Sequence, residues 1–215
     1  MKSYDYCIFA SSDEIIRKAE GLGWDGVCIL ESGTAVKEMP GSRMDVLKGL
    51  LIETAKPDEA RSAAQRGRKM HGIVAVRGLN EDVNRIASET PEVDILLPGP
   101  GARIDFVMVK LARKNNVAVG FDFSQLLHSS RRDRSGAFSV MLENAKIVKK
   151  FRAPFVLTSG AVSEWDLRAP SELAAFGRVL GLDAPRIREA MSGKMAEENR
   201  KRLGGKWVMP GVEVE

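Results

Sequence analysis

One short segment combines side chains that can hold or transfer phosphate. Residues 124–135 follow an apolar, strand-like run (117–123) and contain several serines and His128, together with three arginines, Arg131, Arg132 and Arg134. Guanidinium groups hold phosphate oxygens with two parallel hydrogen bonds, and hydroxyl groups can add more. Catalytic groups also gather in the loops that follow barrel strands. The segment is therefore either an active site or a surface that grips phosphates without reacting with them.

The histidines and aspartates give little support to a metal-dependent active site. The chain has two histidines, His71 and His128, and neither lies in an HxH or HExxH motif, where two imidazoles share one face. Aspartates at strand positions, such as Asp5, Asp94 and Asp122, can bind metal, cap a helix or accept backbone amides. We expect no metal bound by the protein. The alternative is a metal-dependent phosphoesterase, in which Asp5, Asp122 and His128 would converge on one ion.

Two glycine-containing stretches resemble catalytic or nucleotide-binding motifs only in part. TSGA (158–161) has a serine beside a glycine but no GxSxG elbow to present a nucleophile. PGPGA (98–102) lacks the lysine and the Ser/Thr of a phosphate-binding P-loop. We therefore expect no catalytic side chain in this protein.

Positive charge is concentrated in one part of the chain. The net charge is only +4, but residues 103–152 contain eleven Lys or Arg against four Asp or Glu. Such an asymmetry indicates a contact surface for a polyanion. A folded RNA presents phosphates at irregular positions, which scattered cations suit. Aromatic residues make up only 6% of the chain, which argues against binding by base stacking. The candidate RNA-binding residues are Arg103, Arg113, Lys114, Arg131, Arg132, Arg134 and Arg168.

The hydrophobic pattern alternates between strands and helices. Short apolar runs predict strands at 4–9, 26–30, 47–54, 72–77, 93–99, 117–123 and 155–160. Helical periodicity between them predicts helices at 12–22, 57–70, 80–89, 103–115 and 136–151. This alternation implies a parallel sheet with right-handed crossovers. Seven nearly continuous apolar strands favour an α/β fold of the TIM-barrel type, distorted and ringed by helices, over a doubly wound open sheet.

Length and composition fit one intracellular domain. The 215 residues suit a single barrel-like domain, 1–215, and no apolar run approaches the roughly 20 residues of a membrane helix. The first residues lack the features of a secretory signal, so we expect a cytoplasmic protein. Cys7 and Cys28 lie in strand-like runs, as packed thiols do. We expect a surface loop at 31–46, and helices after residue 163 that are broken at Pro170 and Pro185.

Several motifs in the C-terminal half carry a family resemblance. They are ID (104–105) followed by KNNVAVGF (114–121), then LLHS (126–129), LTS (157–159) and WDLRAP (165–170). Together they resemble the archaeal ribonuclease P protein component 3 family, related to the thirty-kilodalton protein subunit of eukaryotic ribonuclease P. The N-terminal third matches that family only in strand rhythm and length.

The resemblance implies a barrel related to the polymerase-and-histidinol-phosphatase metal hydrolases. Those enzymes begin with a strand that carries Asp-x-His-x-His. The corresponding stretch here is Asp5-Tyr6-Cys7-Ile8-Phe9, with Cys7 and Phe9 in place of the two histidines. The loss of two ligands leaves too few groups to hold the metals of those enzymes.

The resemblance also implies a function and partners. Members of the family assist a catalytic RNA, the ribonuclease P RNA, that removes the 5′ leader from precursor tRNA, and its chemistry belongs to the RNA and its Mg²⁺ ions. They pair with a second, small ribonuclease P protein subunit, commonly in a two-plus-two heterotetramer. By motif, RNA contacts are expected at Arg103, Lys114 and Arg168, whereas the arginines at 131–134 are assigned by charge alone. A third hypothesis is a protein scaffold whose basic face docks an acidic partner.

Overall fold

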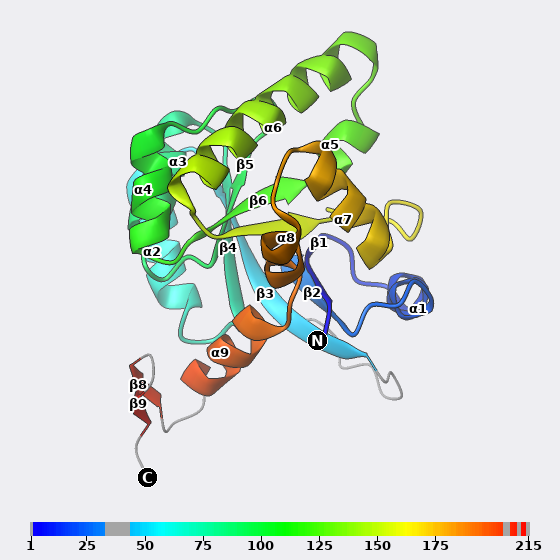
Figure 1. Ribbon diagram of the computed structural model, residues 1–215. Helices are drawn as coiled ribbons and strands as arrows, with labels where there is room; N and C mark the ends of the chain where they lie inside the picture. The colour runs from blue at the N-terminus through cyan, green and yellow to red at the C-terminus, as the bar shows by residue number, and fades with distance from the viewer. Residues whose placement is uncertain (1, 33–43, 204–206, 210–211, 214–215) are drawn as a thin grey trace.

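Seven parallel strands form a sheet in which every strand pairs with the next one along the chain. The computed structural model describes residues 2–32, 44–203, 207–209 and 212–213. The strands follow the order β1 to β7 without interruption, and Figure 1 shows them curving round a common centre. They are β1 (Tyr4–Ile8), β2 (Gly26–Glu31), β3 (Asp45–Thr54), β4 (Ile73–Gly78), β5 (Ile95–Pro98), β6 (Ala118–Asp122) and β7 (Phe155–Thr158). A doubly wound sheet would reverse its strand order, so this alternative is wrong and the barrel prediction is confirmed.

The first and last strands meet through side-chain and loop contacts. The backbone N–H of Cys7 donates to Thr158 Oγ1 at 3.1 Å, and this hydroxyl lies 2.9 Å from the Cys7 carbonyl oxygen. Just beyond the strands, the N–H of Phe9 donates to the carbonyl of Ala161 at 2.8 Å. Among the described residues no ladder of backbone hydrogen bonds joins β1 to β7. The barrel is therefore nearly closed, with its seam held by Thr158.

Helices cover the outside of this barrel. Those that connect the strands are α1 (Asp13–Gly21), α2 (Pro57–Gly67), α3 (Glu81–Glu89), α4 (Phe106–Lys114), α5 (Ser124–Leu127) and α6 (Arg131–Phe151). Local sequence signals fix the starts of two of these helices. The side chains of Ser12 and Asn80 accept hydrogen bonds from backbone N–H groups in the first turns of α1 and α3. The apolar faces of the helices pack on the outer strand side chains. The inward side chains form a separate apolar interior.

Both cysteines belong to the interior of the barrel. Cys7 and Cys28 are fully buried and form no disulfide. Burial raises the pKa of both thiols well above the usual range. The prediction that they are packed thiols is therefore confirmed.

Three further helices complete the chain after β7. They are α7 (Pro170–Val179), α8 (Ala184–Ala190) and α9 (Lys194–Leu203), followed by the short antiparallel strands β8 (Trp207–Met209) and β9 (Val212–Glu213). Pro170 and Pro185 stand in the first turns of α7 and α8, where proline is tolerated, so they begin helices and do not break them. In Figure 1, α9 lies against the lower end of the barrel. There the Tyr6 hydroxyl donates to the Ser192 carbonyl at 2.6 Å.

Two predicted helix starts are wrong. Helix α4 begins at Phe106 and not at 103, because Asp105 caps it and accepts from the Met108 N–H at 2.7 Å. Helix α6 begins at Arg131 and not at 136, because the chain turns at Ser130, and Gly136 lies within the helix without ending it. The predicted loop at 31–46 falls mostly on residues outside those described. No helix in the described part of the chain is long and apolar enough to cross a membrane.

Candidate nucleic-acid interface

Asp5 lies deep in the barrel and is held by the end of β7. Its carboxylate accepts hydrogen bonds from the hydroxyls of Thr158 and Ser159 and from the Ser159 N–H, at 3.2 Å for the last. The residue is fully buried, and this burial raises the pKa of the Asp5 carboxyl to about 6 although the hydrogen bonds act in the opposite direction. Hydrogen-bond donors of the protein itself therefore satisfy the Asp5 carboxylate.

Asp122 and His128 have partners of their own. The N–H and the hydroxyl of Ser124 donate to Asp122 Oδ1 at 2.8 and 2.6 Å, and burial raises the pKa of this carboxyl. Gly160 (φ +64°) passes so close that a Cβ there would lie 1.8 Å from the same oxygen. His128 Nε2 lies 3.4 Å from Asp166 Oδ1. The described residues contain no group of three or more His, Cys, Asp or Glu that could hold a metal, so they do not fit the site that the phosphoesterase alternative requires.

Asp94 stabilises the opposite end of the barrel. Both terminal nitrogens of Arg68 donate to its carboxylate, which also accepts from the Val74 N–H at 2.8 Å and from Asn199 Nδ2 at 3.0 Å. Both charged side chains are at most 10% exposed. Burial raises the pKa of Asp94 and lowers that of Arg68 to about 10. The ion pair is therefore structural, and the hydrogen bond from Asn199 ties α9 to it.

The three arginines of the first candidate segment lie on a helix and not in a loop. Arg131, Arg132 and Arg134 form the first turn of α6 and are exposed. The Arg134 guanidinium donates to the Ser129 carbonyl at 3.0 Å and so fastens the preceding turn. Arg131 and Arg132 have no side-chain partner among the described residues. This end of α6 therefore presents two free cations.

Two predicted RNA contacts are engaged within the protein. The Arg103 Nε donates to Glu143 Oε2 of α6 at 2.6 Å. Arg168 donates to the carbonyls of Trp165 and Leu167 at 3.0 and 2.7 Å, and its guanidinium lies 5.2 Å from the centre of the Phe123 ring. Both residues therefore fix local structure, and their charges are partly satisfied before any ligand binds.

The remaining two predicted residues lie far from the first group. Arg113 and Lys114 end α4, and Arg113 Nη1 donates to the Phe151 carbonyl at 3.1 Å, at the last residue of α6. A helix of the length of α6 spans about 30 Å. The arginines at 131–134 and the pair Arg113 and Lys114 thus lie at opposite ends of α6, and the predicted residues do not form one cluster.

A larger basic surface surrounds Arg113 and Lys114. It consists of the exposed side of α4 and of the C-terminal half of α6, and we call it the α4–α6 face. Its exposed cations are Lys110, Arg113, Lys114, Lys146, Lys150 and Arg152. Positions 110 and 114, like 146 and 150, are one helical turn apart and share a side. Glu143, the acid on this part of α6, is paired with Arg103. No acid of the described residues forms an ion pair with these six cations, so the face carries an excess of positive charge.

Of the six cations of this surface, the sequence predicted only Arg113 and Lys114 as RNA-binding residues. The charge excess of residues 103–152 pointed to the region without selecting Lys110, Lys146, Lys150 or Arg152. The four-residue spacing of the lysines within each predicted helix was a usable signal. The docking of α4 against α6 was not visible in the sequence.

Comparisons with known proteins agree on one family. The sequence model of the family described as RNase P subunit p30 matches residues 2–202. Ribonuclease P protein component 3 of Methanosarcina mazei is 30% identical, over 98% of this chain and 95% of the relative. The same component of Methanosarcina barkeri is 31% identical, over 99% of this chain and 95% of the relative.

Solved structures share the fold. A chain in the cryo-EM structure of archaeal ribonuclease P with mature tRNA superimposes with a TM-score of 0.86, at 24% identity and with 98% of this chain and 97% of that chain covered. The crystal structure of Aspergillus niger ochratoxinase gives a TM-score of 0.60 at 9% identity, over 90% and 70% of the two chains. The match to the family model and the identity to the Methanosarcina proteins confirm the resemblance seen in the motifs: this chain belongs to the RNase P subunit p30 family.

Proposed function

We propose that this protein binds the ribonuclease P RNA through the cations of the α4–α6 face and of the first turn of α6, and stabilises the active fold of that RNA. As a member of its family, the chain is a protein subunit of ribonuclease P, the ribonucleoprotein endonuclease of tRNA processing. The observation that carries the proposal is the exposed, unpaired charge of the α4–α6 face. RNA phosphates are its natural complement, because neutralising them releases counterions.

The protein contributes no acid, base or metal ligand to the proposed reaction. The carboxylates at its barrel, Asp5 and Asp122, are occupied by hydroxyl and amide donors of the same chain. We assign the cleavage chemistry to the RNA and to Mg²⁺ held by the RNA. The segment around Arg131 is then a phosphate grip and not an active site.

The proposed partners are those that the family resemblance implies. They are the ribonuclease P RNA, precursor tRNA and a small ribonuclease P protein subunit in a two-plus-two assembly. The chain with a TM-score of 0.86 comes from a structure of archaeal ribonuclease P with mature tRNA, which supports the RNA partners. The pairing with the small subunit is testable by co-purification and by the mass of the complex in solution.

The test is reconstituted cleavage of precursor tRNA. Ribonuclease P RNA is assayed at low Mg²⁺ alone, with this protein, and with this protein plus the small subunit. We expect the proteins to stimulate cleavage at the 5′ leader and to be inert when the RNA is omitted. Chelator-sensitive phosphoester cleavage by the protein alone would instead support the phosphoesterase alternative.

A further inference from the structure

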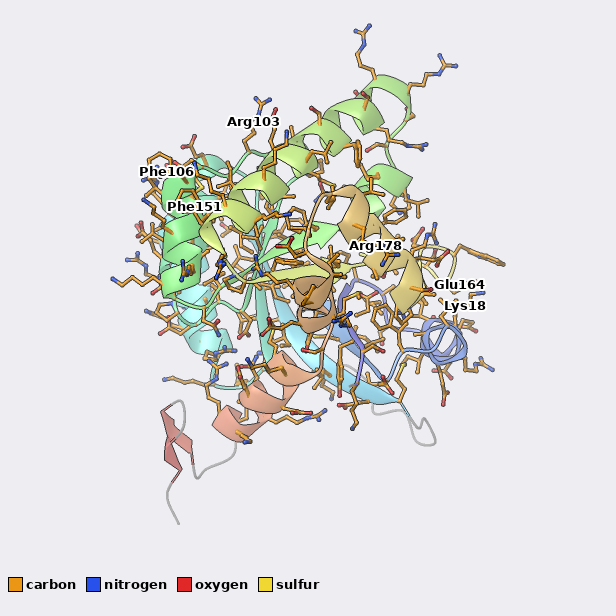
Figure 2. The ribbon with its side chains drawn as sticks, in the orientation of Figure 1. Lys18, Arg103, Phe106, Phe151, Glu164 and Arg178 are labelled. Atoms are coloured by element: carbon orange, nitrogen blue, oxygen red, sulfur yellow. The ribbon has the colours of Figure 1, made fainter. Side chains whose placement is uncertain are left out.

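A pair of aromatic rings, one exposed and one half-buried, lies within the α4–α6 face. Phe106 begins α4 and Phe151 ends α6, and their ring centres are 6.4 Å apart with an angle of 31° between the ring planes. Phe106 is 54% exposed. Phe151 is half-buried and packs against the core, and Figure 2 shows it beside Phe106 on the α4 side of the molecule. The two rings thus form a small apolar platform that is open to solvent at Phe106.

The fold does not require this exposed ring. The buried side of α4 is formed by Met108, Val109 and Ala112, which already pack on the barrel. Phe106 faces outward with Lys110, one turn later on the same side of the helix. A large apolar side chain in such a position indicates a contact surface when it is rimmed by polar groups.

The groups that rim the platform are cations. The Lys110 ammonium lies 5.2 Å from the centre of each ring, and the Lys150 ammonium lies 5.6 Å from the centre of Phe151. Arg113 reaches the Phe151 carbonyl from the same side. The aromatic surface and the positive charge are therefore joined in one site.

We infer that the Phe106–Phe151 pair is a stacking site for an unpaired base of the bound RNA. A base that is splayed out of an RNA loop offers a flat π surface with phosphates on either side, and proteins read such bases by aromatic stacking. The two rings offer the base a surface on which to stack, and the flanking lysines can bind its phosphates. Lys110 has a flexible stem, so its ammonium can leave the rings for a phosphate as the base enters.

This inference rests on the proposed function and adds a contact that phosphate neutralisation does not supply. The low aromatic content of the chain argued against stacking as the main mode of RNA binding. One local platform is compatible with that argument, because the bulk of the affinity still comes from the cations. The alternative ligand of the Phe106–Phe151 pair is an aromatic or acidic segment of a protein partner.

The test measures the affinity of ribonuclease P RNA for variants at position 106 across a range of salt concentrations. We expect Phe106→Ala and Phe106→Leu each to weaken binding by about 5- to 100-fold, the range that loss of one base–aromatic stack gives. Phe106→Trp should bind at least as tightly as wild type. The slope of log K against log salt should not change, because no charge is removed. The matched control is Leu79→Ala, since Leu79 is 56% exposed and lies outside the face.

Two results would overturn the platform. The first is wild-type affinity in Phe106→Ala, and the second is wild-type affinity in Phe106→Leu, since leucine keeps apolar area without a π surface. If Phe106→Ala with wild-type RNA affinity also loses binding of the small protein subunit, the occupant of the site is the protein partner and not a base. Failure of the proposed function looks different, because the wild-type protein itself would then show no salt-dependent affinity for the RNA. Melting temperatures of all variants check that the fold is intact.

Discussion

The buried carboxylates of the barrel and the exposed cations of the α4–α6 face differ in whether the protein itself supplies partners for their charge. Asp5, Asp94 and Asp122 are each buried, and each accepts several hydrogen bonds from the chain itself. Lys110 and Lys150 are exposed to solvent, and within the described part of the chain they contact aromatic rings and not acids. Charge that is satisfied internally holds a fold together, whereas unpaired charge at a surface is available to a ligand. We therefore propose that the RNA binds outside the barrel interior.

The largest effect is expected where a buried carboxylate is removed. Asp94→Ala would leave the Arg68 guanidinium buried without its partner, so the free energy of unfolding should fall by about 3–5 kcal/mol. Urea denaturation monitored by circular dichroism measures it. The control is Asp58→Ala, at an exposed acid in the first turn of α2, which should cost less than about 1 kcal/mol. If Asp94→Ala were as stable as this control, the carboxylate would not have the structural role assigned to it.

Removing the exposed cations should spare stability and reduce RNA binding. For Lys110→Gln, Lys114→Gln, Lys146→Gln and Lys150→Gln combined, the slope of log K against log salt should become shallower by about 3 to 4, because each lost phosphate contact removes about 0.7 to 0.9. The unfolding free energy should stay within about 0.5 kcal/mol of wild type. Binding titrations with ribonuclease P RNA at several salt concentrations test both affinity and slope.

A charge-matched variant controls for net charge alone. Lys18→Gln, Lys56→Gln, Lys69→Gln and Lys201→Gln remove the same charge from exposed positions on other elements. Their salt slope should remain close to that of wild type. Equal slopes in the two fourfold variants would mean that the α4–α6 face has no special role.

The buried carboxylates should also make stability depend on pH. The pKa of Asp5 is raised from 3.8 to about 6 in the folded protein, so between these values the folded state binds more protons than the unfolded state. The unfolding free energy should therefore fall as pH rises from about 4 to about 6, by about 2 kcal/mol for this group. Asp5→Asn removes the titration. The difference between wild type and Asp5→Asn should thus change over this range, and a constant difference would contradict the raised pKa.

The smallest effect is expected at the start of α6. Arg131→Gln and Arg132→Gln together remove two unpaired cations, and the salt slope for RNA binding should become shallower by about 1 to 2. Arg134→Gln alone should change the slope less, since this side chain is bound to the Ser129 carbonyl. An unchanged slope in the double variant would remove this segment from the RNA interface.

The barrel was predictable because its signals are local. Each strand is a short apolar run between turn signals, and each helix has a periodic apolar face, so element order follows from neighbouring residues. The start of α6 was misjudged because Gly136 and the serines around it are poor helix formers, and tertiary packing of the helix outweighed them. The caps at Asp105 and Ser130 are decided by backbone geometry that the sequence pattern leaves open.

The interface was only partly predictable because it depends on contacts between distant residues. The charge count located the basic region, but it did not distinguish Arg103, which is paired with Glu143, from Lys114, which is not. Phe106 and Phe151 are far apart in sequence and meet only because α4 packs beside α6. Whether a charged side chain is free or engaged is a property of the folded surface.

The Mg²⁺ requirement of precursor-tRNA cleavage tests the central claim most directly. Ribonuclease P RNA is assayed with the small subunit and with either wild-type protein, the fourfold Lys110/Lys114/Lys146/Lys150 variant or the charge-matched control. If cations of the α4–α6 face stabilise the RNA fold, the fourfold variant should need more Mg²⁺ for half-maximal cleavage, and the control should behave as wild type. Equal Mg²⁺ requirements for all three proteins, or cleavage in the absence of the RNA, would contradict the account.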